Sequence, residues 1–141
     1  MKKRTFLIVL IVLALAVASY QLTTPIRMKG VVRRLLRSPQ LEVEVATKLV
    51  GGFEPTYAAI VVYDTAKAPE FCRSLNLYEL HSEDRDRRLN LLKSMPKAFP
   101  GKFMDATNQH LQMYVGTLKH APFATDAVIG NDRIYFIFSR Y

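Results

Sequence analysis

The chain has one cysteine and three histidines, the side chains that most often serve as nucleophile, general base or metal ligand. A cysteine becomes a good nucleophile when a neighbouring histidine lowers the pKa of its thiol. His81 is the histidine nearest in sequence to Cys72, yet nine residues along one helix would separate the two by about 13 Å. Nucleophilic chemistry at Cys72 therefore requires the fold to bring His110 or His120 close to it.

No motif accompanies these residues at the spacing that a particular chemistry requires. The histidines lack the i, i+4 pairing of a helical zinc site, and a single cysteine excludes a multi-cysteine zinc site and an intramolecular disulfide. Ser94 and Lys97 form an S-x-x-K string, but its companion strings S-D-N and K-T-G are absent from the sequence. We therefore expect no catalytic residue, metal or cofactor. The enzymatic alternative is a small hydrolase that uses Cys72, a histidine and Asp64 or Asp105.

The net charge of +8 belongs to the N-terminal end of the chain. All 12 acidic residues and 12 of the 20 basic residues lie between Ser38 and Tyr141, so this part is formally neutral. The other basic residues flank an apolar segment: Lys2, Lys3 and Arg4 precede it, and Arg27, Lys29, Arg33, Arg34 and Arg37 follow it. A nucleic-acid-binding protein needs basic groups over the face that meets the phosphates. We therefore expect a membrane, and no nucleic acid, as the partner of these charges.

The apolar segment supports two interpretations, a cleaved signal sequence and a retained anchor. Residues 6–18 are an unbroken apolar run that spans about 20 Å as a helix, less than the ~30 Å hydrocarbon core of a bilayer. Ala16-Val17-Ala18 before Ser19 is a small-x-small cleavage pattern. Counting from Thr5 to Leu22 lengthens the span to about 27 Å. We expect residues 1–22 to form a signal-anchor or transmembrane helix that is retained.

Basic residues on the two sides of this segment give conflicting signals about its orientation. The cluster before a first membrane segment usually stays in the cytoplasm, which places the rest of the chain outside. The five basic residues after the segment also favour the cytoplasm, so the inverted orientation stays open. We expect a single-pass protein of the inner (cytoplasmic) membrane with a periplasmic domain. The alternative is a chain that is cleaved and then secreted or released into the periplasm.

Residues 23–38 are predicted to form a basic amphipathic helix beside the membrane. Thr24 and Pro25 resemble a helix start, and Pro39 ends the pattern. Apolar side chains share one face, namely Met28, Val31, Val32, Leu35 and Leu36. The other face carries Arg27, Lys29, Arg33, Arg34 and Arg37. Such a helix can lie on anionic lipid, with each nearby charge adding about 1 kcal/mol. Alternatively, its apolar face packs on the domain that follows.

Residues 39–141 are predicted to form one α+β domain with a mostly antiparallel sheet of about five strands. Alternating or continuous apolar residues predict strands over 41–50, 57–64 and 110–118, and two more over 125–140 joined by a turn at Gly130-Asn131-Asp132. The last of these strands is apolar on both faces, which predicts either an interior position or one that covers a ligand or a partner.

Two helices are predicted between the second and third strands. In the first, which begins near Pro69, Phe71, Leu75 and Tyr78 fall at helical spacing. The second covers 82–93, with Ser82 as its cap and acidic residues in its first turn. The resulting order, ββααβββ, resembles the layout of PAS and profilin-like domains and of extracytoplasmic sensor domains that follow a membrane anchor. The resemblance is one of topology alone.

Aromatic side chains are the best candidates for partner contact in this neutral domain. Phe53 and Tyr57 lie within "GGFEPTY", which contains a flexible turn, and Tyr135 lies in "RIYFIF". Aromatic residues of this kind often anchor interfaces. We expect a membrane-tethered, non-catalytic extracytoplasmic domain that binds a ligand or a protein partner of the cell envelope. The non-enzymatic alternative is a structural or assembly subunit of an envelope complex.

Overall fold

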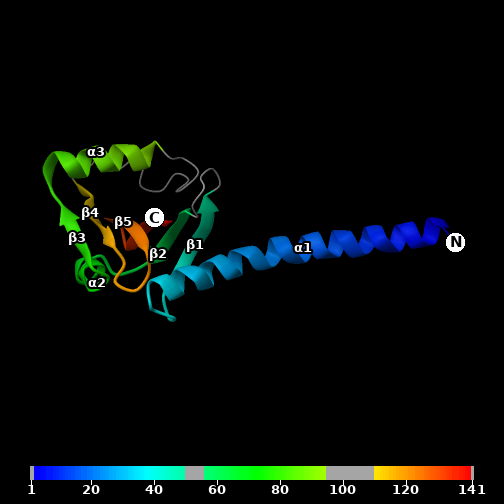
Figure 1. The fold of residues 1–141 in the computed structure, drawn as a ribbon. Coiled ribbons are helices and arrows are strands. Elements are labelled where there is room, and N and C mark those ends of the chain that lie inside the picture. The colour runs from blue at the N-terminus through cyan, green and yellow to red at the C-terminus, as the bar shows by residue number, and fades with distance from the viewer. Residues whose placement is uncertain (1, 50–55, 95–109, 141) are drawn as a thin grey trace.

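The computed structural model describes residues 2–49, 56–94 and 110–140. Within these residues the order of elements is α1, β1, β2, α2, β3, α3, β4, β5, β6 (Figure 1). The helices are α1 (Lys2–Leu35), α2 (Ala68–Ser74) and α3 (Ser82–Lys93). The strands are β1 (Glu42–Leu49), β2 (Thr56–Val62), β3 (Leu77–Leu80), β4 (Gln112–Thr117), β5 (Phe123–Gly130) and β6 (Arg133–Arg140). The expected α+β class is confirmed.

The strands form one antiparallel sheet of six strands, one more than expected, in the order β1-β2-β6-β5-β4-β3. The predicted hairpin at its centre is confirmed. Gly130 lies opposite Arg133, so Asn131 and Asp132 make a two-residue turn. Asp132, the second of these two residues, has a φ of 50°, a left-handed conformation that aspartate tolerates better than most residues. The hairpin fixes the register of β5 against β6 and so decides which face of the sheet each β5 side chain takes.

The unpredicted strand is β3, and the sequence prediction of one helix from Pro69 through Tyr78 is wrong in its second half. The helix α2 ends at Ser74, and Asn76 has a φ of 70°, a left-handed conformation that terminates helices. From Leu77 onward the side chains alternate, since Leu77 is buried and Tyr78 is 63% exposed. Helical spacing and strand alternation both fit these few residues, and pairing with β4 decides for the strand.

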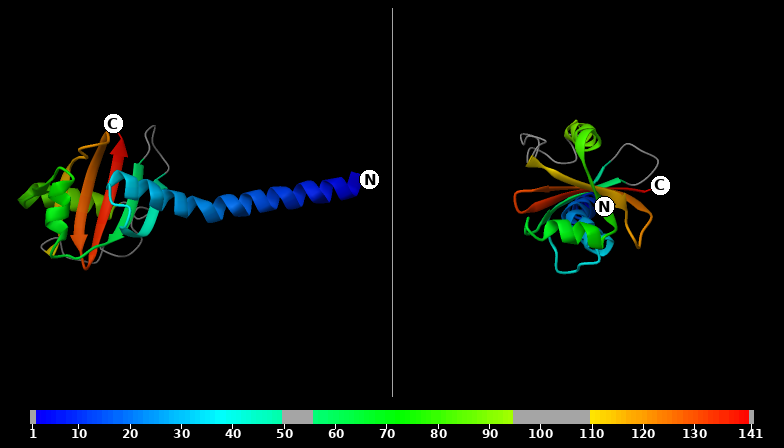
Figure 2. Two further views of the ribbon diagram at one scale, coloured as in Figure 1. Left: turned by 90° about the horizontal axis from the view of Figure 1, so that it is seen from below. Right: turned by 90° about the vertical axis from the view of Figure 1, so that its left-hand side faces the viewer.

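Both faces of the sheet are covered (Figure 2). The end of α1 and α2 cover one face, and α3 lies over the other. The strand β6 has two apolar faces for this reason: Ile134, Phe136 and Phe138 join the core on the α1 side, and Tyr135 and Ile137 join the core under α3. The interior position predicted for this strand is confirmed.

The helix α1 runs without interruption through Pro25, so the sequence prediction that a second helix starts at Thr24 is wrong. A proline inside a helix has no N–H to donate to the carbonyl four residues earlier. Two hydroxyls bind carbonyls in this turn, since Thr23 Oγ1 donates to Ser19 O at 2.8 Å and Thr24 Oγ1 donates to Tyr20 O at 2.6 Å. The apolar segment and the basic amphipathic segment are therefore one rod.

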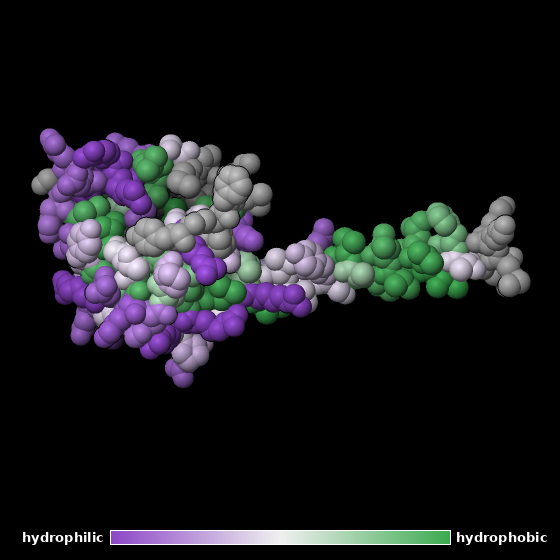
Figure 3. Space-filling view, viewed as in Figure 1, coloured by the Kyte–Doolittle hydropathy of each residue, from purple (hydrophilic) through white to green (hydrophobic). Residues whose placement is uncertain are grey.

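This rod is long and apolar enough to cross a membrane by its length and composition, a test that a signal sequence near an N-terminus also passes. It projects from the domain, and its apolar part forms a separate green shaft in Figure 3. Large side chains along it, from Phe6 to Leu22, are more than half exposed. No charged residue occurs between Thr5 and Ile26, a stretch of about 33 Å as a helix. The continuous helix thus supplies the length that the apolar run alone lacks.

The C-terminal turns of α1 belong to the domain core. Val32 and Leu36 are almost fully buried against the sheet, and Arg33 Nε donates to Leu41 O at 2.9 Å. The helix ends with Arg37 at a φ of 50°, while Ser38 N donates to Arg33 O at 3.0 Å. This is a Schellman ending, with an arginine at the position that usually holds glycine. The predicted packing of the apolar face on the domain is confirmed.

The helix α3 matches its prediction except at its first residue. It begins at Ser82, and His81 occupies the cap position, so the prediction of Ser82 as the cap is wrong. Glu83 and Asp84 lie in the first turn and Lys93 in the last, where each charge favours the helix dipole. Leu89 and Leu92 of α3 are buried in the core on this side of the sheet.

Candidate functional site: a groove between α3 and the sheet

A groove of about 890 Å³ lies between α3 and strands β3, β4 and β5. We call it the α3 groove. Tyr78 on β3 lies opposite Val115 on β4, which lies opposite Asp126 on β5, so these three residues cross the sheet in one row. Arg88 and Leu91 of α3 line the other wall. The groove therefore depends on the register of three strands and on how α3 sits above them.

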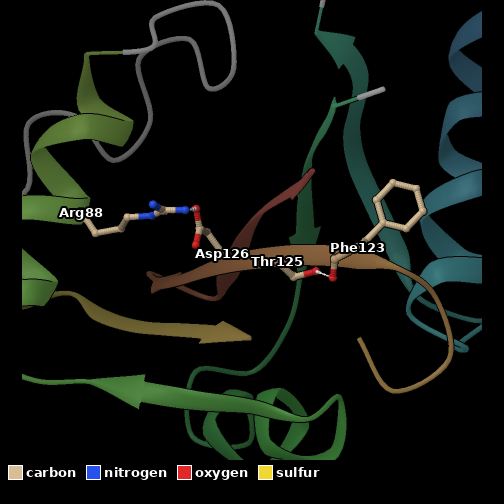
Figure 4. Close-up of polar contacts among 4 residues, drawn as sticks. All are labelled: Arg88, Phe123, Thr125 and Asp126. Carbon is tan, nitrogen blue, oxygen red and sulfur yellow. Dashed lines mark hydrogen bonds and ion pairs between the residues drawn. The ribbon is translucent and has the colours of Figure 1, made fainter. Parts of the chain in front are cut away.

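The centre of the α3 groove is an ion pair between α3 and the sheet (Figure 4). Arg88 donates to Asp126 Oδ2 from both Nε, at 3.1 Å, and Nη2, at 2.8 Å. The Asp126 side chain is only 10% exposed, while that of Arg88 is 47% exposed. Burial raises the pKa of the Asp126 carboxyl, and Arg88 acts in the opposite direction. Without the guanidinium, this carboxylate would lose much of its compensation for leaving water.

Local strand geometry aims Asp126 into the groove. Side chains alternate along β5, so Asp126 shares a face with Val128, and Thr125 takes the opposite face. Thr125 is buried, and its Oγ1 donates to Phe123 O at 3.3 Å. The second oxygen of Asp126, Oδ1, accepts no hydrogen bond from the described residues. It is therefore available to a donor that enters the groove.

Apolar side chains stand exposed on both sides of the α3 groove. Tyr78 is 63% exposed and Leu91 is 54% exposed. Beyond α1, in the part of the chain that the structure describes, these are the two large hydrophobic side chains that are exposed. Both line this groove. An exposed apolar pair around an ion pair with a buried carboxylate is suited to contact with another molecule.

Opposite charges are already matched within this groove. Arg87 Nη2 lies 2.8 Å from Asp84 Oδ1 at the rim, and Arg88 is paired with Asp126 at the centre. The groove therefore has little net charge of its own. It can offer hydrogen bonds and apolar surface, and it does not favour a strongly charged ligand.

The three aromatic residues that the sequence predicted as binding residues do not gather at this groove. Phe53 lies outside the described residues. Tyr57 is half-buried on β2, and its ring lies 6.0 Å from that of Phe123. Tyr135 is 4% exposed in the core beneath α3, and burial raises its pKa. The prediction of Tyr135 as a contact residue is therefore corrected, because a core side chain cannot meet a partner.

Sequence reasoning missed the residues that do line the groove. Arg88 lies in a run of alternating charges, residues 83–88, a pattern that usually indicates a solvated helix face. Asp126 is the one acid in the strand "FATDAVIG", and its position in an apolar strand is the signal that could have found it. Tyr78 fits the helical spacing predicted from Pro69 but lies on β3. All three residues reach the groove through contacts between segments distant in the sequence.

Cys72 lies in the core between α2 and the sheet and is fully buried. Burial raises the pKa of its thiol to about 12, so the thiolate is scarce at neutral pH. His81, His110 and His120 are exposed, whereas Cys72 is buried. Asp64 is exposed and its carboxylate accepts a hydrogen bond from Ala66 N, while Asp105 lies outside the described residues. Among the described residues, no group of three His, Cys, Asp or Glu side chains is placed to hold a metal ion.

The basic residues predicted for the membrane surface lie on the last turns of α1. Arg27, Arg34 and Arg37 are exposed, and Lys29 and Arg33 are partly buried. Four of the five, all except Lys29, line a second hollow, which is separate from the α3 groove. The two hollows share no lining residue.

No protein-family model matches the chain, and no curated protein or solved structure is significantly similar to it. The topological resemblance to PAS and profilin-like domains therefore adds no site residue and no activity to the geometry described above.

Proposed function

We propose that the protein is a membrane-anchored, non-catalytic domain that binds a protein partner in the α3 groove. The observation that carries the proposal is the exposure of Tyr78 and Leu91 on the two sides of one groove. Tyrosine in particular is enriched among residues that dominate binding energy. A partner that inserts an apolar side chain between them would cover the two large hydrophobic side chains that the described domain exposes beyond α1.

The polar centre of the groove supports a protein partner. Asp126 Oδ1 is open to a hydrogen-bond donor, such as a backbone N–H or a side-chain amide. The edge position of β3 in the sheet also suits an extended segment, because an edge strand presents backbone groups to a neighbour. Tyr78 would then contact the side chains of that segment. A partner segment with apolar and uncharged polar residues fits this combination.

The packing of α1 supports a retained anchor. The same helix that holds the apolar shaft ends with Val32 and Leu36 in the domain core, so cleavage before Ser19 would leave a helix that still projects from the domain. We propose that α1 stays in the inner membrane with the domain outside the cytoplasm, as the N-terminal basic cluster favours. A mature chain that starts at Ser19 would contradict retention. A reporter joined after Tyr141 that is active only in the cytoplasm would contradict the orientation.

Photo-crosslinking in the membranes of the producing cells tests the groove. A photoreactive phenylalanine at Tyr78 should give a discrete protein adduct, whereas the same group at Glu70, exposed on α2, should not. Leu91→Glu places a charge at the rim and should reduce the Tyr78 adduct at least tenfold. Asn90→Glu adds the same charge at a neighbouring position of α3 that does not line the groove, and should leave the adduct unchanged. Equal yields in the two variants, or equal yields at Tyr78 and Glu70, would overturn the proposal.

A further inference from the structure

The hollow at the end of α1 has a volume of about 880 Å³ and is lined by basic residues. We call it the α1 hollow. Arg27, Arg33, Arg34 and Arg37 line it together with apolar residues, and its lining contains no acidic residue. Gly30 also lines it, and a Cβ built at Gly30 would find no atom within 4 Å. The glycine therefore leaves an open floor between arginines.

The arginines of the α1 hollow lack acidic partners. Arg27, Arg34 and Arg37 make no ion pair within the described part of the chain. Arg33 is held in place by its bond to Leu41 O, a neutral acceptor. Arg37 and Lys119 also contribute to a lowered pKa of His120, after the effect of its partial desolvation. The local potential is positive, and nothing described in the chain neutralises it.

The position of the hollow along α1 corresponds to the headgroup layer of a bilayer. The uncharged stretch from Thr5 to Ile26 spans about 33 Å, close to the ~30 Å hydrocarbon thickness, so Arg27 is the first charge beyond it. Gly30 lies about 4.5 Å further along the axis. Each headgroup layer is roughly 5 to 8 Å thick. The floor of the hollow therefore lies at the depth of the lipid phosphates.

Helix geometry also directs these side chains toward the membrane. In an α-helix each Cα–Cβ bond tilts toward the N-terminus, which in α1 is the membrane end. The long side chain of Arg34 therefore leans back toward the headgroups rather than away from them. Guanidinium groups bind phosphate oxygens through two parallel hydrogen bonds, which makes arginine well suited to this ligand.

We propose that the α1 hollow binds the phosphate of an anionic phospholipid headgroup in the leaflet next to the domain. This inference rests on the proposed membrane anchor. Occupancy would hold the domain at a fixed angle to the membrane, because the hollow is built on turns that also pack in the core. The α3 groove would then keep one fixed orientation relative to the membrane.

The test uses the full chain in nanodiscs that contain equal amounts of phosphatidylglycerol and phosphatidylcholine, and counts retained lipids by native mass spectrometry. The wild type should retain about ten times more phosphatidylglycerol than phosphatidylcholine. Gly30→Glu fills the floor with a carboxylate and should remove the preference. Gly30→Ala is the matched control: its methyl group fits the open space, and the preference should persist. Equal preference in the two variants, or no preference in the wild type, would overturn the proposal.

Two further arms separate the possible sources of failure. Inorganic phosphate at millimolar concentration should not displace the lipid, and displacement would identify free phosphate as the ligand instead. Resistance of the chain to extraction from membranes by alkaline carbonate measures the anchor independently. A chain that is extracted contradicts the anchor, whereas a chain that is retained but shows no lipid preference contradicts only the headgroup site.

Discussion

The α3 groove and the α1 hollow have nearly the same volume, about 890 and 880 Å³, but differ in how their arginines are compensated. In the α3 groove Arg87 is paired with Asp84 and Arg88 with Asp126. In the α1 hollow the lining contains four arginines and no acid. Paired charges leave a site that favours apolar and hydrogen-bonding ligands, whereas unpaired charges leave one that favours an anion. Similar hollows can thus serve different ligands.

The two regions also differ in how deeply their residues enter the core. The α1 hollow stands on Val32 and Leu36, which are buried in the core on the α1 side of the sheet. The rim of the α3 groove is made by Tyr78 and Leu91, which are exposed. Substitutions near the hollow should therefore affect stability, and substitutions at the groove rim should affect binding alone.

The largest effect should come from Leu36→Ala. This change removes a side chain that is 2% exposed and leaves a cavity between α1 and the sheet, so the free energy of unfolding should fall by about 3 kcal/mol. Leu91→Ala removes the same atoms from an exposed site and should cost less than about 0.5 kcal/mol. Denaturant unfolding of the full chain in detergent micelles measures both. Similar losses in the two variants would remove the distinction between the regions.

Arg88→Gln should have the next largest effect, and that effect should depend on pH. It leaves the Asp126 carboxylate buried without a cation, so the free energy of unfolding should fall by about 1 to 2 kcal/mol at neutral pH. The pKa of Asp126 is already raised in the folded state and would rise further. The loss in free energy of unfolding relative to the wild type should therefore be largest at a pH above the Asp126 pKa of the variant. It should shrink as the pH falls through that pKa, because protonation removes the buried charge.

The control for this prediction is Arg87→Gln. Arg87 and Asp84 are 79% and 70% exposed, so their pair should contribute less than about 0.5 kcal/mol at any pH. Unfolding curves at pH 7.5 and pH 5 compare the two variants. If the stability lost in Arg88→Gln is larger at pH 5 than at pH 7.5, the raised pKa assigned to Asp126 is contradicted.

Arg37→Gly should separate stability from lipid binding. Arg37 has a left-handed φ of 50° at the end of α1, where glycine is favoured, so this variant should gain about 0.5 to 1 kcal/mol of stability. It also removes one cation from the α1 hollow and should weaken the preference for phosphatidylglycerol by a few-fold. Unfolding and native mass spectrometry of the same preparation measure the two effects. A variant that is more stable and binds lipid equally well would argue against a role for Arg37.

The smallest effect concerns His120, whose pKa is lowered in part by Arg37. Arg37→Gln removes a nearby cation, so the protonated imidazolium should become easier to form and the pKa of His120 should rise. Binding of an anionic headgroup in the wild type should raise the pKa in the same direction. Titration of the imidazole proton resonances in nanodiscs with and without phosphatidylglycerol reports this change. A pKa that falls on anion binding would contradict the positive potential assigned to this end of α1.

The sequence predicted features that depend on neighbouring residues. The apolar side chains on both faces of residues 134–138 predicted an interior strand, the turn after Gly130 predicted a hairpin, and the apolar face of 23–38 predicted packing on the domain. It failed where two local patterns coincided. Residues 71–78 fit helical spacing until Asn76 adopts a positive φ, and Pro25 suggested a helix start although it lies inside a continuous helix.

The α3 groove could not be predicted in this way because it depends on distant contacts. Arg88 and Asp126 are 38 residues apart, and their pairing requires the β5–β6 register and the placement of α3 together. The arginines of the α1 hollow were found from the sequence, since five basic residues within eleven positions need no tertiary information. The sequence could not show that Gly30 leaves an open floor between them.

The most direct test of the distinction between the two regions is a pair of photo-crosslinkers in the full chain in its native membrane, one at Leu91 and one at Pro39. Both positions are exposed, and they line the α3 groove and the α1 hollow respectively. With lipids labelled by radioactive phosphate, we expect an unlabelled protein adduct from Leu91 and a labelled phospholipid adduct from Pro39. The same class of adduct from both positions would contradict it.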